Sequence, residues 1–105
     1  RMLESWFLAD ESLADFFHIS GALLPRNPDA ETNPKQTLVN LARRSKSRAL
    51  RADLVPDTGS LGVVGKGYTP RMTEFIEQHW HPSEAQKRSH SLRRALVAIR
   101  KAVQP

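Results

Sequence analysis

Residues 62–70 combine three glycines with Lys66 and Thr69, directly before an expected helix. Backbone N–H groups in such a loop, together with the positive end of the helix dipole, can bind an anion. Lys66 would add a charge and Thr69 a hydroxyl group. The spacing is not that of a P-loop, because no Gly-Lys-Ser/Thr sequence occurs. The alternative, which we favour over a phosphate site, is a loop whose glycines supply positive φ angles and which is ordered near a site.

Positive charge is concentrated in two segments that contain no acidic residue. Residues 34–51 and residues 87–105 each carry a net charge of +6, although the whole chain carries +5. Such blocks attract phosphates and predict a nucleic-acid contact. The alternative is that they are solvated helix faces, or that they pair with the acidic residues of segment 1–33. The arginines and lysine that we assign to a nucleic-acid contact are Arg43, Arg44, Lys46, Arg48, Arg93 and Arg94.

His79 and His81 flank Trp80 and suggest metal binding at first sight. Alternating histidines can chelate a metal from a strand, but on a helix they diverge by roughly 200°. No nearby carboxylate completes a zinc site, which needs three or four ligands. We therefore expect Trp80 in the core and the histidines in solvent. Asp10 is best interpreted as a helix cap, and no nucleophile–base combination can be identified.

Composition narrows the class of protein. The 105 residues are 39% hydrophobic and 26% charged, which is typical of a globular domain, and they contain no cysteine. Disulfides, Cys-ligated zinc and thiol nucleophiles are therefore excluded. No apolar run approaches the ~20 residues that span a bilayer, and the first residues do not resemble a signal peptide. We expect a cytoplasmic protein without a membrane partner.

Hydrophobic spacing and capping signals predict a mainly α fold with four to five short helices and a Gly-rich loop. Asn33-Pro34 and Thr69-Pro70 each place a capping residue before a proline at the first helical position. We expect residues 1–105 to form a single helical domain or domain fragment. Helices are expected over 11–18, 34–48, 70–79 and 90–103, with a further short helical segment from His81-Pro82 and at most a short strand near 61–64. The residues expected to be mostly buried are Phe16, Leu38, Leu41, Phe75, Ile76, Trp80, Leu92, Leu96 and Ile99.

The string Glu4-Ser-Trp-Phe-Leu-Ala-Asp10, followed by Leu24-Pro25 and Asn33-Pro34-Lys35, resembles the C-terminal half of an uncharacterised bacterial domain family. Gly65-Lys-Gly-Tyr-Thr69, Trp80 and the later Ser91-Leu-Arg-Arg94 fit the same family in the same order. The match spans nearly the whole chain, and the Glu4 string is its most specific part. Fuller members begin with a half that resembles a Toprim domain, an α/β metal-binding fold of topoisomerases, primases and certain nucleases.

The resemblance implies that this chain is the C-terminal part of a larger α/β, Toprim-like domain. Glu4 would then be a catalytic carboxylate that holds a divalent metal such as Mg²⁺ with acids from the other half. Lys35, Lys66 and Tyr68 would contact phosphate. Family members often lie beside ATPase genes of bacterial defence systems, which implies an ATPase partner. As a ligand of a composite metal site, Glu4 is expected at the surface, without a Lys or Arg partner.

Two functions are therefore predicted from the sequence. The first is the C-terminal portion of a metal-dependent nucleic-acid-processing or defence-associated protein. This chain by itself supplies at most one or two of the oxygens that metal-dependent cleavage requires, so its isolated activity is not assigned. The alternative is a non-catalytic helical module that binds a partner protein through the apolar faces of segments 70–80 and 91–103.

Overall fold

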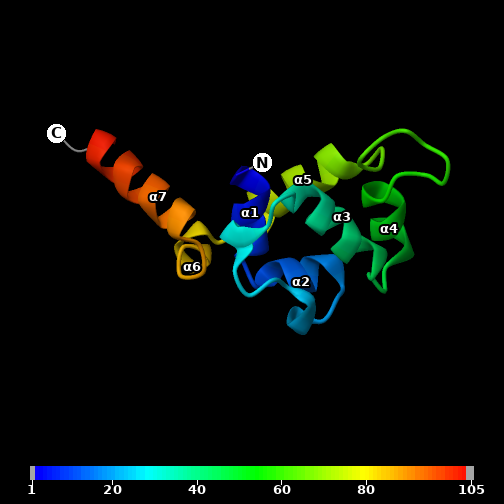
Figure 1. The fold of residues 1–105 in the computed structure, drawn as a ribbon, viewed down its shortest axis with the longest axis horizontal. Coiled ribbons are helices and arrows are strands. Elements are labelled where there is room, and N and C mark those ends of the chain that lie inside the picture. Colours follow the sequence, from blue (N-terminus) through cyan, green and yellow to red (C-terminus); the bar gives the residue numbers. More distant parts are fainter. Residues whose placement is uncertain (1, 104–105) are drawn as a thin grey trace.

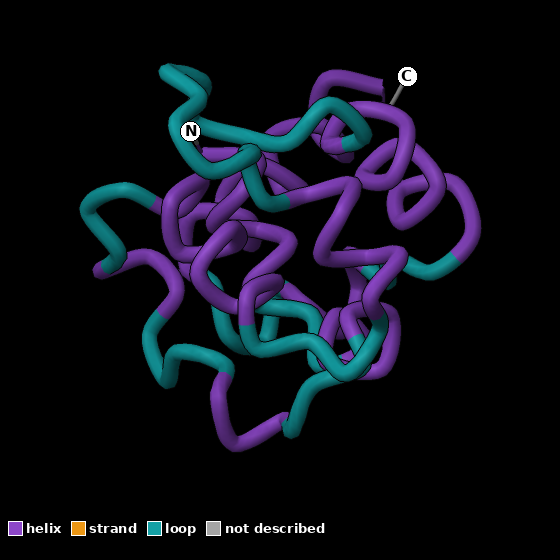
Figure 2. The backbone as a smooth tube through the Cα atoms, turned by 90° about the vertical axis from the view of Figure 1, so that its right-hand side faces the viewer, coloured by secondary structure: helices purple, strands orange, loops and turns teal. Residues whose placement is uncertain are grey.

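Helices make up all the regular structure of residues 2–103, the part of the chain that the computed structural model describes (Figure 1; Figure 2). The mainly α prediction is confirmed, but the structure has more helices than the four to five expected. Residues 61–64, where at most a short strand was expected, form no strand: residues 63–64 are a bend, and Leu61 is fully exposed. The elements are α1 (Met2–Leu8), α2 (Ser12–Phe17), the 3₁₀ turns η1 (Gly21–Leu23) and η2 (Pro28–Ala30), α3 (Pro34–Arg43), α4 (Arg48–Leu54), α5 (Tyr68–Gln78), α6 (Pro82–Ala85) and α7 (His90–Val103).

The expected helix over 34–48 is interrupted after Arg43. Asn33 caps its start as predicted, because the Asn33 side chain accepts a hydrogen bond from the Gln36 N–H at 3.2 Å. At Ser45 the side-chain oxygen accepts from the Ser47 N–H at 2.9 Å, which offers the backbone an alternative to helix. The Lys46 N–H meanwhile donates to the carbonyl of His18, in the α2 segment. Two helices, α3 and α4, therefore replace the single one.

The core lies between α1, α2, α3, α4 and α5. Phe7 packs edge-on against Phe75 and Trp80, with ring centroids 5.7 and 5.4 Å apart. Of the residues expected in the core, Leu38, Leu41, Phe75 and Leu92 are buried, and Phe16, Trp80 and Leu96 are half-buried. Ile76 is 39% exposed and Ile99 57% exposed, so burial was wrongly predicted for these two.

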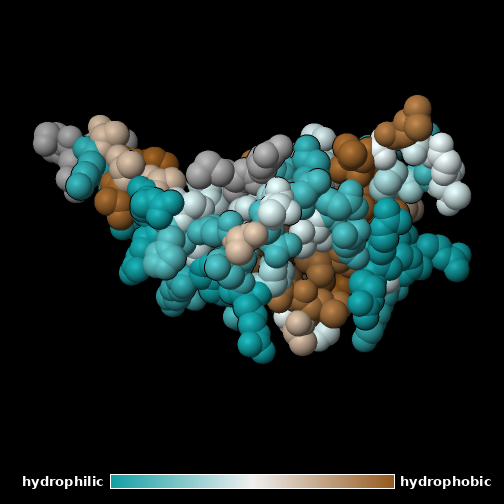
Figure 3. Space-filling model, in the orientation of Figure 1, coloured by the Kyte–Doolittle hydropathy of each residue, from teal (hydrophilic) through white to brown (hydrophobic). Residues whose placement is uncertain are grey.

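Ile99 is exposed because it lies on helix α7, which projects beyond the rest of the molecule (Figure 1). Its first turn is fixed by Asp29, whose carboxylate accepts hydrogen bonds from the hydroxyls of Ser89 and Ser91 and from the Ser91 N–H. Leu92 packs against Ala9 and Ala85, but the later turns extend past this contact. Apolar side chains on α7 are consequently visible at the surface among hydrophilic ones (Figure 3).

The dimensions of the molecule reflect this projection. The principal extents are 51 × 26 × 25 Å, with α7 at one end of the long axis and α4 at the other (Figure 1). Within residues 2–103, every helix is too short or too polar to traverse a bilayer.

Candidate functional site

Three residues that the sequence singled out lie together although they are far apart in the chain. Glu4 lies on α1, Lys35 in the first turn of α3, and Tyr68 at the start of α5. The Tyr68 hydroxyl donates a hydrogen bond of 3.0 Å to Oε2 of Glu4. Nζ of Lys35 lies 5.8 Å from the centroid of the Tyr68 ring, within cation–π range. We call these residues the Glu4 cluster.

Burial distinguishes the members of the Glu4 cluster. Glu4 and Tyr68 are each only 8% exposed, whereas Lys35 is exposed. The expectation that Glu4 lies at the surface is therefore wrong. Its position follows from helical spacing: Glu4 precedes Phe7 by three residues and Leu8 by four, and both of those belong to the core.

The electrostatics of the Glu4–Tyr68 pair are those of an ionised carboxylate held by a neutral phenol. Burial alone would raise the pKa of Glu4, but hydrogen bonding to the carboxylate outweighs it, and the net pKa lies below the ordinary value of 4.5. Burial, reinforced by the negative charge of Glu4, raises the pKa of Tyr68 far above its usual range. At neutral pH the Tyr68 phenol therefore stays protonated, and its O–H group donates a hydrogen bond to a charged acceptor. Hydrogen bonds of this kind are strong.

The Gly-rich loop positions Tyr68 by packing against the end of α4. The Gly65 N–H donates to the Leu54 carbonyl and the Gly67 N–H to the Asp53 carbonyl, both at 2.9 Å. A Cβ atom on Gly65 would lie 2.4 Å from the Asp53 carbonyl oxygen. Glycine is thus required here for close approach. Among the glycines of residues 2–103, only Gly59 has a positive φ angle, and it lies outside the 62–70 motif. Positive φ angles are therefore not found at the glycines of the motif, where they were expected.

The same packing determines whether the loop can bind an anion. The N–H groups of Gly65 and Gly67 are used by backbone carbonyls. A Cβ atom on Gly67 would lie 2.5 Å from Oδ1 of Asp53, so a carboxylate already stands at the start of α5. Oδ2 of Asp53 accepts two hydrogen bonds from Arg71, at 2.9 and 2.7 Å. These contacts favour an ordered loop over an anion-binding loop. Lys66, which lies within the loop, is exposed.

The two basic blocks lie at opposite ends of the molecule. Figure 3 shows long hydrophilic side chains projecting at the α4 end, whereas Arg93 and Arg94 are exposed on α7 at the other end. The structure therefore does not combine the two blocks into one surface. Around the junction of α3 and α4, all four assigned residues are exposed; this basic corner consists of Arg43, Arg44, Lys46 and Arg48.

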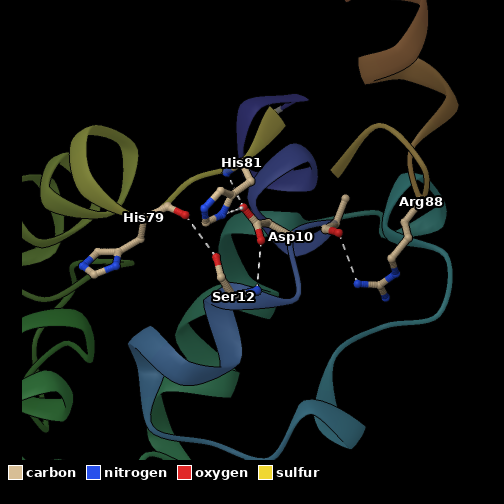
Figure 4. A network of polar contacts seen from close by, with 6 residues as sticks. Asp10, Ser12, His79, His81 and Arg88 are labelled. Carbon is tan, nitrogen blue, oxygen red and sulfur yellow. Dashed lines mark hydrogen bonds and ion pairs between the residues drawn. The ribbon is translucent and has the colours of Figure 1, made fainter. Parts of the chain in front are cut away.

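A polar network around Asp10 joins parts of the chain that sequence reasoning did not connect (Figure 4). The Asp10 carboxylate accepts from the N–H of Ser12, the first residue of α2, at 2.9 Å, and from the His81 N–H at 2.5 Å. Glu11 stands between Asp10 and α2 at the N-cap position, so Asp10 holds the start of the helix from one residue further away than expected. Nδ1 of His81 lies 3.5 Å from the same carboxylate. Arg88 donates to the carbonyls of Ala9, at 3.2 Å, and Pro25, at 2.6 Å. No sequence signal marks these contacts, since Asp10 and His81 are 71 residues apart.

The Asp10 network contains a serine, a histidine and an aspartate but does not form a relay between them. The Ser12 hydroxyl donates to the His79 carbonyl at 3.2 Å rather than to the His81 imidazole. His79 and His81 are both exposed, as expected from the sequence, and the half-buried Trp80 lies between them. The network therefore connects the α1–α2 junction with the α5–α6 junction.

Within residues 2–103, no group of three or more His, Cys, Asp or Glu side chains is arranged to hold a metal ion. The ionised Glu4 carboxylate is suited by its chemistry to a hard divalent cation, but it would be one ligand among several. Comparison with protein-family models, with curated protein sequences and with solved structures found no match to this chain.

Proposed function

We propose that this chain is the C-terminal portion of a Toprim-like, metal-dependent nucleic-acid-processing protein, to which the Glu4 cluster contributes one side of the active site. The observation that carries the proposal is a buried carboxylate that accepts a hydrogen bond from a phenol, with an exposed lysine against the phenol ring. A hydrogen bond to a ligating carboxylate fixes its orientation and is a common feature of metal sites.

Each member of the Glu4 cluster has a distinct part in this proposal. Glu4, although buried in this chain, would supply one carboxylate oxygen for a divalent cation such as Mg²⁺, and further acidic ligands would come from the half that the family resemblance adds. Such a cation, when bound, would supply Lewis-acid stabilisation of charge on a phosphate. Tyr68 orients the Glu4 carboxylate through its hydroxyl, and Lys35 is positioned to contact a phosphate oxygen.

The basic corner supplies the affinity for the nucleic-acid backbone. Its four side chains are exposed, and residues 34–51 contain no acidic residue to neutralise them. Contacts of this kind bind phosphates without reading base sequence. Binding should therefore be general for unrelated sequences and should weaken steeply with salt, because each neutralised phosphate releases counterions.

The variant Glu4→Gln in the full-length protein tests the proposal. The substitution preserves the shape of the side chain and an acceptor oxygen but removes the charge. We expect divalent-metal-dependent cleavage of nucleic acid to be lost, with nucleic-acid binding nearly unchanged. Glu77→Gln, an exposed carboxylate on α5, is the matched control and should keep full cleavage. Full cleavage activity in Glu4→Gln would overturn the catalytic role.

A second candidate function, binding of a partner protein, is favoured by the projecting helix α7. Val97 and Ile99 are exposed on it, beyond the contact that Leu92 makes with the body. The family resemblance suggests an ATPase as the partner. Ile99→Asp should abolish association with that ATPase, whereas Leu61→Asp, in an exposed loop, should not. An association that resists high salt would support this second function, and an unchanged association in Ile99→Asp would contradict it.

A further inference from the structure

A hollow beside the basic corner is lined by three arginines from two helices. Arg43 comes from the last turn of α3, and Arg48 and Arg51 come from α4. The hollow has a volume of about 380 Å³, which is within the range of small-ligand sites. Arg51 belongs to the basic block 34–51 but lies outside the set that the sequence analysis assigned to a nucleic-acid contact; the structure places it in the lining of the same hollow as Arg43.

The charges around this hollow are poorly compensated. Within the described residues, none of the three arginines forms an ion pair with a carboxylate; the ion pairs there join Arg71 to Asp53, His81 to Asp10, and Lys87 to Glu84. Asp57 is the one acidic residue that lines the hollow, so three positive charges face one negative charge.

One of the three guanidinium groups is fixed in place. Nη1 of Arg51 donates a hydrogen bond to the carbonyl of Ser45, a residue that is buried. This contact holds the Arg51 side chain at the wall of the hollow before any ligand arrives. Arginine presents several N–H donors in one plane, and a preorganised group of this kind suits two oxygens of one phosphate.

Part of the lining of the hollow is apolar. Ala52, Val55 and Pro56 supply this part, and Thr58 adds a hydroxyl group. An isolated phosphate would not use these apolar side chains, whereas a nucleotide would place its sugar or base against them. The combination of three arginines and apolar side chains in one hollow therefore points to a phosphate at the end of a nucleotide chain.

We propose that this hollow binds the terminal phosphate monoester of a nucleic acid, with the adjoining nucleotide against Val55 and Pro56. This inference rests on the proposed function, since it assumes a nucleic-acid ligand. A terminal phosphate carries about −1.5 to −2 charges near neutral pH, whereas each internal phosphate carries about −1. A site with three arginines gains more from the doubly charged group, so it distinguishes the end of a strand from its interior.

The experiment compares oligonucleotides of one sequence that carry a 5′-phosphate, a 3′-phosphate or hydroxyl groups at both ends. Binding is measured by fluorescence anisotropy with an internal label at constant salt. We expect one phosphorylated end to bind about tenfold more tightly than the hydroxyl end, the gain expected from charge-assisted hydrogen bonds. Which end gains affinity identifies the source of the phosphate.

Variants connect this preference to the hollow. Arg43→Gln and Arg48→Gln should remove the preference, and Asp57→Asn should increase it. Arg26→Gln, an exposed arginine elsewhere in the chain, is the matched control and should keep it. A measurement on the unaltered protein does not depend on any variant: inorganic phosphate, at constant ionic strength, should lower the affinity for the phosphorylated oligonucleotide to that for the hydroxyl-ended one.

The outcomes separate the two proposals. Equal affinity for phosphorylated and hydroxyl ends, with nucleic-acid binding present, would overturn the terminal-phosphate site but leave the proposed function intact. A preference that persists in both Arg43→Gln and Arg48→Gln, or that inorganic phosphate does not abolish, would also overturn it. Absence of any nucleic-acid binding would contradict the proposed function itself.

Discussion

Replacing Tyr68 with phenylalanine removes the hydroxyl that donates to the buried Glu4 carboxylate at 3.0 Å. The aromatic ring and its packing are retained, so little apolar burial is lost. A hydrogen bond to a charged group contributes about 1.5–3 kcal/mol, and the exposed fraction of Glu4 is too small for water to replace the donor fully. We therefore expect Tyr68→Phe to lower the free energy of unfolding by about 2 kcal/mol.

Urea denaturation at neutral pH measures this loss. With a slope of about 1.5 kcal/mol/M, the midpoint should fall by about 1.3 M while the slope stays the same. The pH dependence gives a second measurement. The pKa of Glu4 is lowered in the folded state, so its stabilisation is present above pH 4.5 and is lost as the pH falls through the lowered folded pKa. Because the phenol contributes to that lowering, Tyr68→Phe should reduce the difference in stability between pH 7 and pH 3.

Two comparisons show whether the hydrogen bond is responsible. Thr73→Val removes a hydroxyl from the exposed side of the same helix, where it bonds the Thr69 carbonyl, and should change stability by less than about 0.5 kcal/mol. In a double-mutant cycle with Glu4→Gln, the two losses should not add, since Tyr68→Phe removes the donor and Glu4→Gln the acceptor charge of one charge-assisted hydrogen bond. Wild-type stability in Tyr68→Phe, or additive losses in the cycle, would refute this account of the Glu4 cluster.

Three further changes test other parts of the structure. Gly65→Ala should destabilise the protein by about 2 kcal/mol, because its Cβ would meet the Asp53 carbonyl oxygen at 2.4 Å, whereas Gly21→Ala, with nothing within 4 Å, should be nearly neutral; thermal unfolding compares the two. Hydrogen bonds lower the pKa of Asp29 despite the opposing effect of burial, so its hold on the start of α7 should persist above pH 3.8 and weaken as the pH falls below it. Hydrogen exchange of the α7 amides should show this change, and the variant Asp29→Asn should lack it. Joint replacement of the basic corner by glutamine should weaken nucleic-acid binding about equally for unrelated sequences and should make the salt dependence shallower; unchanged binding would mean that these four residues form only a solvated face.

Local features of this protein could be predicted from the sequence because they depend on neighbouring residues. The mainly helical class, the Asn33-Pro34 start of α3 and the approximate ranges of α2, α5 and α7 follow from spacing and capping. The same holds for the exposed basic residues near Arg43, since a charged block without acids has no local partner. Glu4 and Tyr68 could be singled out individually by the family resemblance, but their contact could not.

The tertiary structure decided everything that depends on contacts between distant segments. Ser45 interrupts the expected helix where the Lys46 N–H donates to the His18 carbonyl, and Arg43 and Arg51, on the two resulting helices, line the same hollow. The apolar residues of α7 have the spacing of a buried helix face. Ile99 is nevertheless exposed, because the other helices do not extend far enough along α7 to cover it. Glu4 is buried against Tyr68, 64 residues away, because α1 and the start of α5 pack on the same core. Periodicity shows which side of a helix is apolar, but only the packing of the other helices determines what covers that side.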